Sequence, residues 1–157
     1  MVKINQIIGT MVNIVLFNCI FYASCKNDSG SKKDRSKGRI EAVYYNKIGV
    51  GPIVSVELSD SINSEMAREG ESVFIAKCLL CHELSSDRKI GPGMAGVTKR
   101  RRPEWILNQI LNPMEMTQKD SLSKELVLIY QSQMLDMKLT KNEARSVLEF
   151  LRKRDRE

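Results

Sequence analysis

The feature that most constrains this chain is the run Cys-Leu-Leu-Cys-His at residues 78–82. Its two cysteines are one helical turn apart, so their sulfurs can face the same side of the chain. There Cys78 and Cys81 can each form a thioether bond to a vinyl group of one haem, and the imidazole of His82 can bind the iron from below. This spacing is the attachment signature of a c-type haem. It therefore predicts one covalently bound haem c with its iron as the cofactor.

Two other kinds of site share part of this spacing, and neither has the rest of its pattern here. A thioredoxin-like redox pair lies inside a βαβ pattern, which does not surround residues 78–82. A structural zinc site needs a second pair of ligands, but the chain has a single histidine and no second Cys-x-x-Cys. The other cysteines, Cys19 and Cys25, belong to an apolar N-terminal run, so none remains for a disulfide framework.

The N-terminus has the pattern of an export signal. Lys3 supplies the positive start, residues 14–22 carry no charge and are apolar apart from Asn18, and Ala-Ser-Cys follows at 23–25. This ending resembles a bacterial lipobox, in which the cysteine is lipidated and becomes the new N-terminus. We therefore expect residues 1–24 to be a signal peptide and Cys25 the lipidation site of a protein tethered on the periplasmic side of the membrane. An ordinary cleaved signal and an uncleaved anchor are the alternatives.

The composition divides the remainder of the chain into a tether, an arm and one domain. Residues 26–38 contain no apolar side chain and predict a solvated tether. Residues 39–58 contain loosely alternating Ile, Val and Tyr and predict an extended arm that lies against the domain. We therefore expect a flexible tether and arm over 25–61 and a domain over 62–157.

Four segments of the domain carry helix signals, and no internal repeat is apparent. Each begins with a capping residue or a proline, and its apolar residues recur at helical spacing. The first has Ser61 or Asn63 as its cap, the third has Asp120 or Ser121, and the last begins with a capping box at Thr140. The predicted helices are 64–76, 103–111, about 121–130, and 141–152. The domain is therefore expected to be all-α.

Residues outside the motif extend the pattern and indicate a family. Gly70, Phe74 and Cys78 follow one another at four-residue steps, and residues 90–97 read Ile-Gly-Pro-Gly-Met-Ala-Gly-Val. Over about 62–152 the chain resembles class I (mitochondrial-type) monohaem cytochromes c, in their bacterial exported short-chain form. The resemblance implies a small domain of three to five helices around the haem. It also implies that the last helix crosses the first closely at Gly70, with an aromatic filling the contact and Val147 and Phe150 at the matching positions.

The resemblance also implies roles around the haem. Residues 90–97 are similar to the Gly-Pro-x-Leu-x-Gly loop of the family, in which the carbonyl of Pro92 would accept the second ring N–H of His82. Residues 102–113 are similar to a helix of many exported bacterial members. Trp105 on that helix has two interpretations: a donor to a haem propionate, or a core aromatic on an amphipathic helix. The basic run 99–102 is either a solvated lead-in to that helix or a surface for propionate neutralisation or docking.

His82 is the only histidine, so a second histidine ligand from the same chain is excluded, and the other axial position takes a methionine, a lysine or other amine, a water, or nothing. Met66 and Met94 fit ordinary packing, and four other methionines near or after residue 112 remain: Met114, Met116, Met134 and Met137. In the family the ligand comes from an irregular loop ahead of the last helix, in a Met-Pro-x-x-x-Leu-Thr/Ser pattern. Residues 134–140 have that spacing, with Leu135 in place of proline. We therefore expect His82 and Met134 as the iron ligands, with Met116 as the second choice.

Two protein ligands on the iron leave no position for a substrate. We therefore expect a one-electron carrier and not an enzyme, working between a membrane quinol-oxidising complex and a terminal oxidase or reductase. One alternative is a haem ligand sensor or peroxidase-like enzyme with an open sixth position. Another is a dedicated electron-transfer subunit of one terminal reductase or oxidase. The net charge is +6, but basic and acidic residues are interleaved and the chain reads as exported, so nucleic acid is not expected as a partner.

Overall fold

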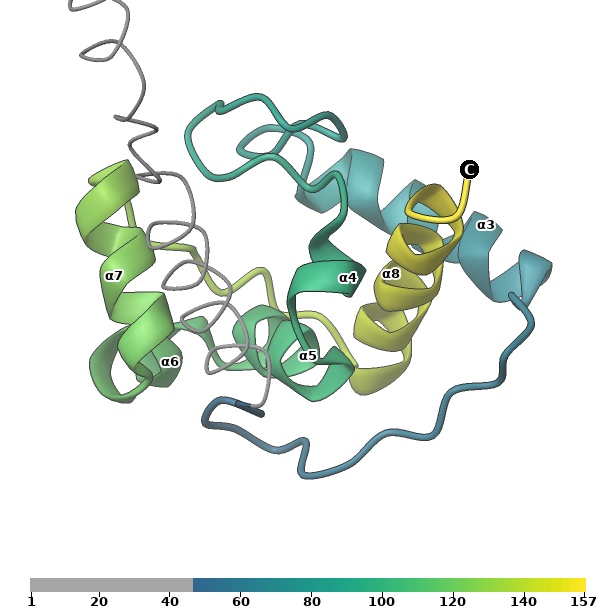
Figure 1. Ribbon diagram of the computed structural model, residues 1–157, viewed down its shortest axis with the longest axis horizontal. Coiled ribbons are helices and arrows are strands. Elements are labelled where there is room, and N and C mark those ends of the chain that lie inside the picture. The colour runs from purple at the N-terminus through teal and green to yellow at the C-terminus, as the bar shows by residue number, and fades with distance from the viewer. Residues whose placement is uncertain (1–46) are drawn as a thin grey trace, which may run out of the picture. The chain divides into compact units, whose positions relative to one another are not determined.

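A computed structural model of the chain describes residues 47–157, and within this range it contains six helices and no strand (Figure 1). The predicted signal peptide, its Cys25 and the tether lie outside the described residues. No helix within the described range is long and apolar enough to cross a membrane. The helices are α3 (Ser64–Lys77), α4 (Val97–Arg100), α5 (Pro103–Leu111), α6 (Pro113–Lys119), α7 (Ser121–Tyr130) and α8 (Lys141–Arg154). The all-α prediction is confirmed.

Side-chain caps start three of these helices where the sequence predicts them. The side chain of Asn63 accepts a hydrogen bond from the backbone N–H of Met66 and begins α3, so Asn63 and not Ser61 is the cap. Asp120 caps α7 in the same way through Ser123. Thr140 forms the predicted capping box with α8. These three helix starts are therefore local properties of the chain.

Two short helices, α4 and α6, were not predicted and bring the described total one above the expected maximum of five. Pro113 ends α5 as expected, but it also takes the first position of α6, where its fixed φ suits a helix start. Gly96 precedes α4 with a φ of 70°, and the side chain of Asp155 accepts hydrogen bonds from the backbone N–H groups of Gly96 and Thr98. Since Asp155 is 57 positions or more from both residues in the chain, local sequence signals could not reveal α4.

The closest helix packing joins α3 to α8. A Cβ atom on Gly70 would overlap the backbone carbonyl of Ser146, so only glycine allows the two backbones to approach this far. Beside this point the rings of Phe74 and Phe150 pack with centroids 5.6 Å apart, tilted by 53°. Val147 is also buried there. The expected crossing of the first and last helices at Gly70 is confirmed.

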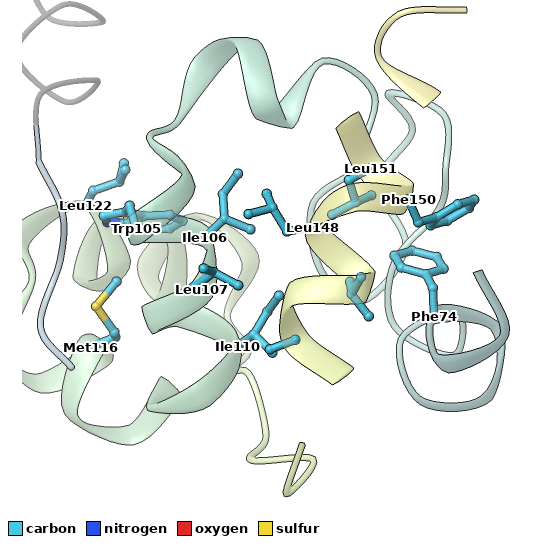
Figure 2. Packing of buried hydrophobic residues seen from close by; sticks show 12 residues of the cluster. Phe74, Trp105, Ile106, Leu107, Ile110, Met116, Leu122, Leu148, Phe150 and Leu151 are labelled. Atoms are coloured by element: carbon cyan, nitrogen blue, oxygen red, sulfur yellow. The ribbon is translucent and has the colours of Figure 1, made fainter. Parts of the chain in front are cut away.

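The hydrophobic core extends from this crossing through α5 (Figure 2). In the close view, Phe74 and Phe150 lie at one end, the α8 side chains Leu148 and Leu151 come next, and the α5 side chains follow. Trp105, Met116 and Leu122 lie at the other end. The core is therefore one continuous cluster, in which α5 and α8 occupy the middle.

The segment before α3, from Lys47 to Ile62, has no helix and lies against α5 and α6. The buried side chain of Asn108 donates hydrogen bonds to the carbonyls of Ile48 and Ile53 and accepts one from the N–H of Ile53. The N–H of Val50 donates to the sulfur of Met116 at 3.0 Å. Buried polar atoms thus satisfy the backbone of this segment where no sheet partner is present.

A buried carboxylate, Glu149, connects α8 to the start of α3. Its side chain is 1% exposed and accepts hydrogen bonds from Arg145 at 2.7 Å, Arg152 at 2.8 Å and the backbone N–H of Asn63 at 2.9 Å. Burial acts to raise the pKa of this carboxyl, but the three donors outweigh burial and hold the pKa below its ordinary value. Glu149 is therefore ionised in the folded protein at neutral pH.

Gly70→Ala tests the helix crossing. Helix propensity alone would make this change stabilising by about 1 kcal/mol, whereas the overlap with Ser146 predicts destabilisation by about 1–3 kcal/mol. Guanidinium unfolding of the haem-loaded protein measures the difference. Glu71→Ala on the exposed side of α3 is the control and should stay within about 0.5 kcal/mol of the parent. A stabilised Gly70→Ala variant would show that the close crossing is not formed.

Glu149→Gln tests the buried charge and has a defined pH dependence. At pH 7 we expect the free energy of unfolding to fall by about 2 kcal/mol, because the donors lose a charged acceptor. The pKa is lowered on folding, so the stabilisation by Glu149 is complete above the unfolded pKa of about 4.3 and is lost as the pH falls through the lower, folded pKa. The difference between parent and variant should therefore shrink below about pH 4. A difference that stays constant from pH 7 to pH 3 would contradict this account.

Candidate haem site

The motif begins directly at the end of α3. The backbone N–H of Cys78 donates to the carbonyl of Phe74, as in a continuing helix, so the first cysteine is held by the last turn. The chain then tightens, and the N–H groups of Cys81 and His82 both donate to the carbonyl of Cys78 at 3.0 Å. This compact turn keeps the two thiols and the imidazole together. Both cysteines are free and partly buried.

The state of the thiols argues against a thioredoxin-like pair. Burial, together with the neighbouring Cys81, raises the pKa of the Cys78 thiol to about 11, against the lowering effect of Lys77. A catalytic redox pair needs a thiolate stabilised near neutral pH. Cys78 is protonated and unreactive as a nucleophile at that pH, which fits a residue whose role is structural attachment.

The imidazole of His82 is held by the loop that follows the motif. Its Nδ1 lies 2.8 Å from the carbonyl oxygen of Pro92, as the family resemblance implied. The backbone N–H of Gly91 donates to the carbonyl of Cys81, and a Cβ on Gly91 would come within 2.6 Å of the ring carbon Cε1. A carbonyl partner requires a proton on Nδ1, so the lone pair is on Nε2. The structure gives Nε2 no partner within residues 47–157, which leaves it available to a metal.

Two contacts connect the motif region to the irregular segment between α7 and α8. On one side Arg88 donates to the carbonyl of Tyr130 at 3.0 Å and its guanidinium lies 4.9 Å from the centre of the Tyr130 ring. On the other side the amine of Lys77 donates to the carbonyl of Met137 at 3.4 Å. Because Lys77 and Arg88 flank the motif, they hold both ends of the segment against it. Met134 lies in the middle of that segment.

The four candidate methionines have different environments. Met116 is 0% exposed, and its sulfur accepts the N–H of Val50 inside the core. The sulfur of Met114 accepts from Gln133 on the surface. Met137 is exposed, next to the start of α8. Met134 is partly buried against the core, and its sulfur lies 3.7 Å from Nε2 of Gln109. Met134 and Met137 both lie on the segment joined to the motif region, and of these two only Met134 is partly buried against the core.

Trp105 is a packing residue in the described contacts. Its ring is buried, and its indole N–H donates to the capping carboxylate of Asp120 at 3.2 Å. The core interpretation therefore agrees with these contacts, since the N–H proposed for a propionate already has an acceptor inside the protein. The basic run is also engaged: Arg102 pairs with Glu104, and Arg101 lies 5.9 Å from the centre of the Trp105 ring.

Several residues near the site do not belong to any sequence motif and were not predicted. Lys77, Arg88 and Gln109 contact the segment that bears Met134, and Ser123 contacts Gln109, yet each is an ordinary polar residue in the sequence. Gln109 had one usable signal: it is four positions after Trp105 and so lies on the same face of α5. Lys77 is 60 positions from its partner Met137, and Arg88 is 42 positions from its partner Tyr130. No local sequence pattern predicts contacts over such separations.

The residues present fit a haem. The donor set is two free thiols and an imidazole with a free Nε2, which is the set that a c-type haem requires. Large apolar side chains are also exposed on the motif turn, on the loop after it and on the Met134 segment, including Leu80 at 78%, Ile90 at 48% and Leu135 at 69%. Exposed apolar groups next to such donors are what an apolar macrocycle would cover.

The comparison with family models decides the family. Residues 67–155 match the model for cytochrome c, more than half of the chain. The chain belongs to the cytochrome c family. Members bind one covalently attached haem with its iron. Membership of the family supports a haem-based electron carrier as the function of this protein.

Solved structures agree with the assignment. A cytochrome c from Rhodothermus marinus is 40% identical with a TM-score of 0.66, over 74% of this chain and 97% of that one. An engineered cytochrome c from the same organism, bound to a carbene intermediate, is 38% identical with a TM-score of 0.64, over 74% of this chain and 98% of that one. A cytochrome c-553-like protein of Synechocystis is 37% identical over 46 residues, which are 29% of this chain and 44% of that protein. The chain therefore matches less than half the length of the Synechocystis relative.

Proposed function

We propose that this cytochrome c carries single electrons between a membrane quinol-oxidising complex and a terminal oxidase or reductase, with His82 and Met134 as the iron ligands. The observation that carries the proposal is the fixed imidazole: Nδ1 is hydrogen-bonded to the carbonyl of Pro92, which leaves Nε2 available to bind iron beside the two thiols. When bound, the haem supplies an Fe(III)/Fe(II) couple, which takes one electron from the donor and passes it to the acceptor. The protein is not an enzyme in this proposal, because His82 and Met134 would occupy the positions on the iron that a substrate needs.

Cys78 and Cys81 hold the group covalently in this proposal. Each thiol would be joined to the haem by addition across one vinyl group, with the sulfur on one vinyl carbon and the thiol hydrogen on the other. The addition involves no net oxidation. Cys78 is held by the last turn of α3 and packs against the core, so a haem attached to it would be anchored to that helix.

Pro92 and Met134 set the electronic state of the iron. The Pro92 carbonyl holds the proton on Nδ1 and increases the basicity of Nε2. The thioether of Met134, as the second ligand, would raise the reduction potential relative to a more basic ligand. The choice of Met134 over Met116 is supported by the environment of the sulfurs, since that of Met116 is enclosed in the core and bonded to Val50.

The location of the carrier is also a proposal. The N-terminal pattern ending at Cys25, outside the described residues, favours a lipid-anchored protein on the periplasmic side of the membrane. A tether keeps a small carrier at high effective concentration beside membrane complexes. From Lys47 onward the chain is already packed against the domain, so the free reach of such a tether is limited to the residues before it.

Met134→Leu and Met116→Leu form a matched pair that tests the axial ligand. Both remove a thioether while nearly conserving volume, and the change itself costs less than about 1.5 kcal/mol. We expect Met134→Leu to lower the midpoint potential, remove the methionine-to-iron charge-transfer band and allow the ferrous form to bind carbon monoxide. Met116→Leu should change none of these three properties. The reverse result would assign the ligand to Met116, and a parent protein that binds carbon monoxide would favour the sensor or peroxidase alternative.

Cys25→Ser tests the anchor. If Cys25 is lipidated, the variant should move from the membrane fraction to the soluble fraction of the cells, and the lipid mass should be absent from the purified protein. Cys19→Ser is the matched control and should remain in the membrane fraction with its lipid. Membrane retention of Cys25→Ser would indicate an uncleaved anchor helix instead.

A further inference from the structure

The segment between Met134 and helix α8 contains a tight turn held by the side chain of Asp136. Oδ1 of Asp136 accepts the backbone N–H of Lys138 at 2.8 Å, and Oδ2 accepts from Nζ of Lys138 at 2.7 Å. Lys138 has a φ of 53°, in the left-handed region. We infer that Asp136 is a positioning residue, which holds this turn closed and so keeps Met134 on the iron and small competing ligands off it. This inference rests on the proposed role of Met134.

The backbone of Lys138 needs a compensating contact. The left-handed region is unfavourable for a residue that carries a Cβ atom, because this atom approaches the following carbonyl oxygen. A short carboxylate that bonds to the N–H two residues ahead offsets this cost, as in other turns that begin with aspartate. The ion pair adds little, since the side chain of Lys138 is 84% exposed and its charge is screened by water and salt. The bond to the backbone N–H is therefore the contact that holds the turn.

The turn lies between two side chains that both pack against the core. Met134 precedes it and Leu139 follows it, and each is partly buried against the core cluster. Thr140 then begins α8 through its capping box. Because only residues 135–138 separate the two core contacts, the direction of the chain at Lys138 decides whether both side chains can reach the core at once. Loss of the turn would release the end that is not fixed by α8, which is the end with Met134.

The same turn directs a backbone carbonyl toward the helix that carries the first cysteine. Met137 is the residue inside the turn, and its carbonyl accepts from Nζ of Lys77 at 3.4 Å. Lys77 is the last residue of α3, directly before Cys78. An open turn would lose this contact, so the turn at Asp136 also keeps the segment close to the haem-attachment motif.

The residue next to the proposed ligand supplies no restraint of its own. Leu135 stands where the related pattern has proline, and its side chain is 69% exposed. Proline fixes φ and limits the conformations of the open chain, whereas leucine does neither. The restraint lies one residue later, at Asp136. It matters for an electron carrier, because an iron that loses its methionine has an open position for other ligands.

The test measures how fast imidazole replaces the methionine in the haem-loaded ferric protein at neutral pH, followed as the loss of the methionine-to-iron band. At saturating imidazole the rate is limited by release of the methionine, which requires the segment to open. We expect Asp136→Ala to raise this limiting rate by about fivefold to tenfold, the effect of losing one hydrogen bond. Without imidazole, the band and the midpoint potential should stay those of the parent, since the closed form still predominates. An unchanged limiting rate would overturn the inference.

Two variants separate the turn from the ion pair. Asp136→Asn keeps an oxygen that can accept the N–H of Lys138 but loses the charge, and Lys138→Met removes the ammonium and leaves the turn in place. Both should exchange methionine for imidazole at close to the parent rate. If Asp136→Asn exchanged as fast as Asp136→Ala, the turn would not be the cause and the inference would fail.

Glu125→Ala is the control for net charge. It removes an exposed carboxylate of α7 and should keep the parent rate, and an equal acceleration in this variant would reduce the effect of Asp136 to a general loss of negative charge. Failure of the proposed ligand is seen separately, because Met134→Leu would then keep the band that imidazole displaces in the parent.

Discussion

The crossing of α3 and α8 at Gly70 is the contact on which the site depends. The C-terminal end of α3 carries Cys78, and the segment bearing Met134 leads directly into the N-terminal end of α8. Where these two helices meet therefore decides how the motif and the ligand segment face each other. The absence of a side chain at Gly70 allows the backbones to touch, and the ring contact of Phe74 with Phe150 fixes the rotation. Lys77, in the last turn of α3, then secures the end of the segment at Met137.

A second group of polar contacts supports the distal side of the site. The start of α7 is hydrogen-bonded to α5 through Asp120 and Ser123, and the segment before α3 is hydrogen-bonded to Asn108 of α5 and Met116 of α6. Helix α5 is thus held by hydrogen bonds of buried groups, and it carries Gln109 toward Met134. Buried polar groups that are fully paired define a single arrangement more strictly than apolar packing alone. A redox site benefits from such rigidity, because a fixed environment changes little when the charge on the iron changes.

Much of the fold could be predicted from sequence, since its signals are local. The capping residues Asn63, Asp120 and Thr140 begin their helices through side-chain bonds to residues three positions ahead, so the signal and its effect lie within one turn. Helix α4 was missed because its stabilising carboxylate, Asp155, is 57 positions away from Thr98 in the sequence, although the two residues are in contact in the fold. Helix α6 was missed because Pro113 reads as a stop signal, although the same residue starts the next helix.

The sequence by itself determined the chemistry of attachment: two thiols one turn apart followed by the only imidazole in the chain. Such a donor set depends on covalent order over five residues, and no long-range contact is needed to recognise it. Which methionine faces the haem is a different question, because Met116 and Met134 both follow plausible breaks in helical structure. The tertiary structure gives the two sulfurs different environments: the sulfur of Met116 is enclosed in the core and accepts the N–H of Val50, whereas the sulfur of Met134 lies beside Gln109. Val50 and Met116 are 66 positions apart in the chain, and Gln109 and Met134 are 25 positions apart. Contacts over such separations are formed by tertiary packing and cannot be predicted from the local spacing of residues.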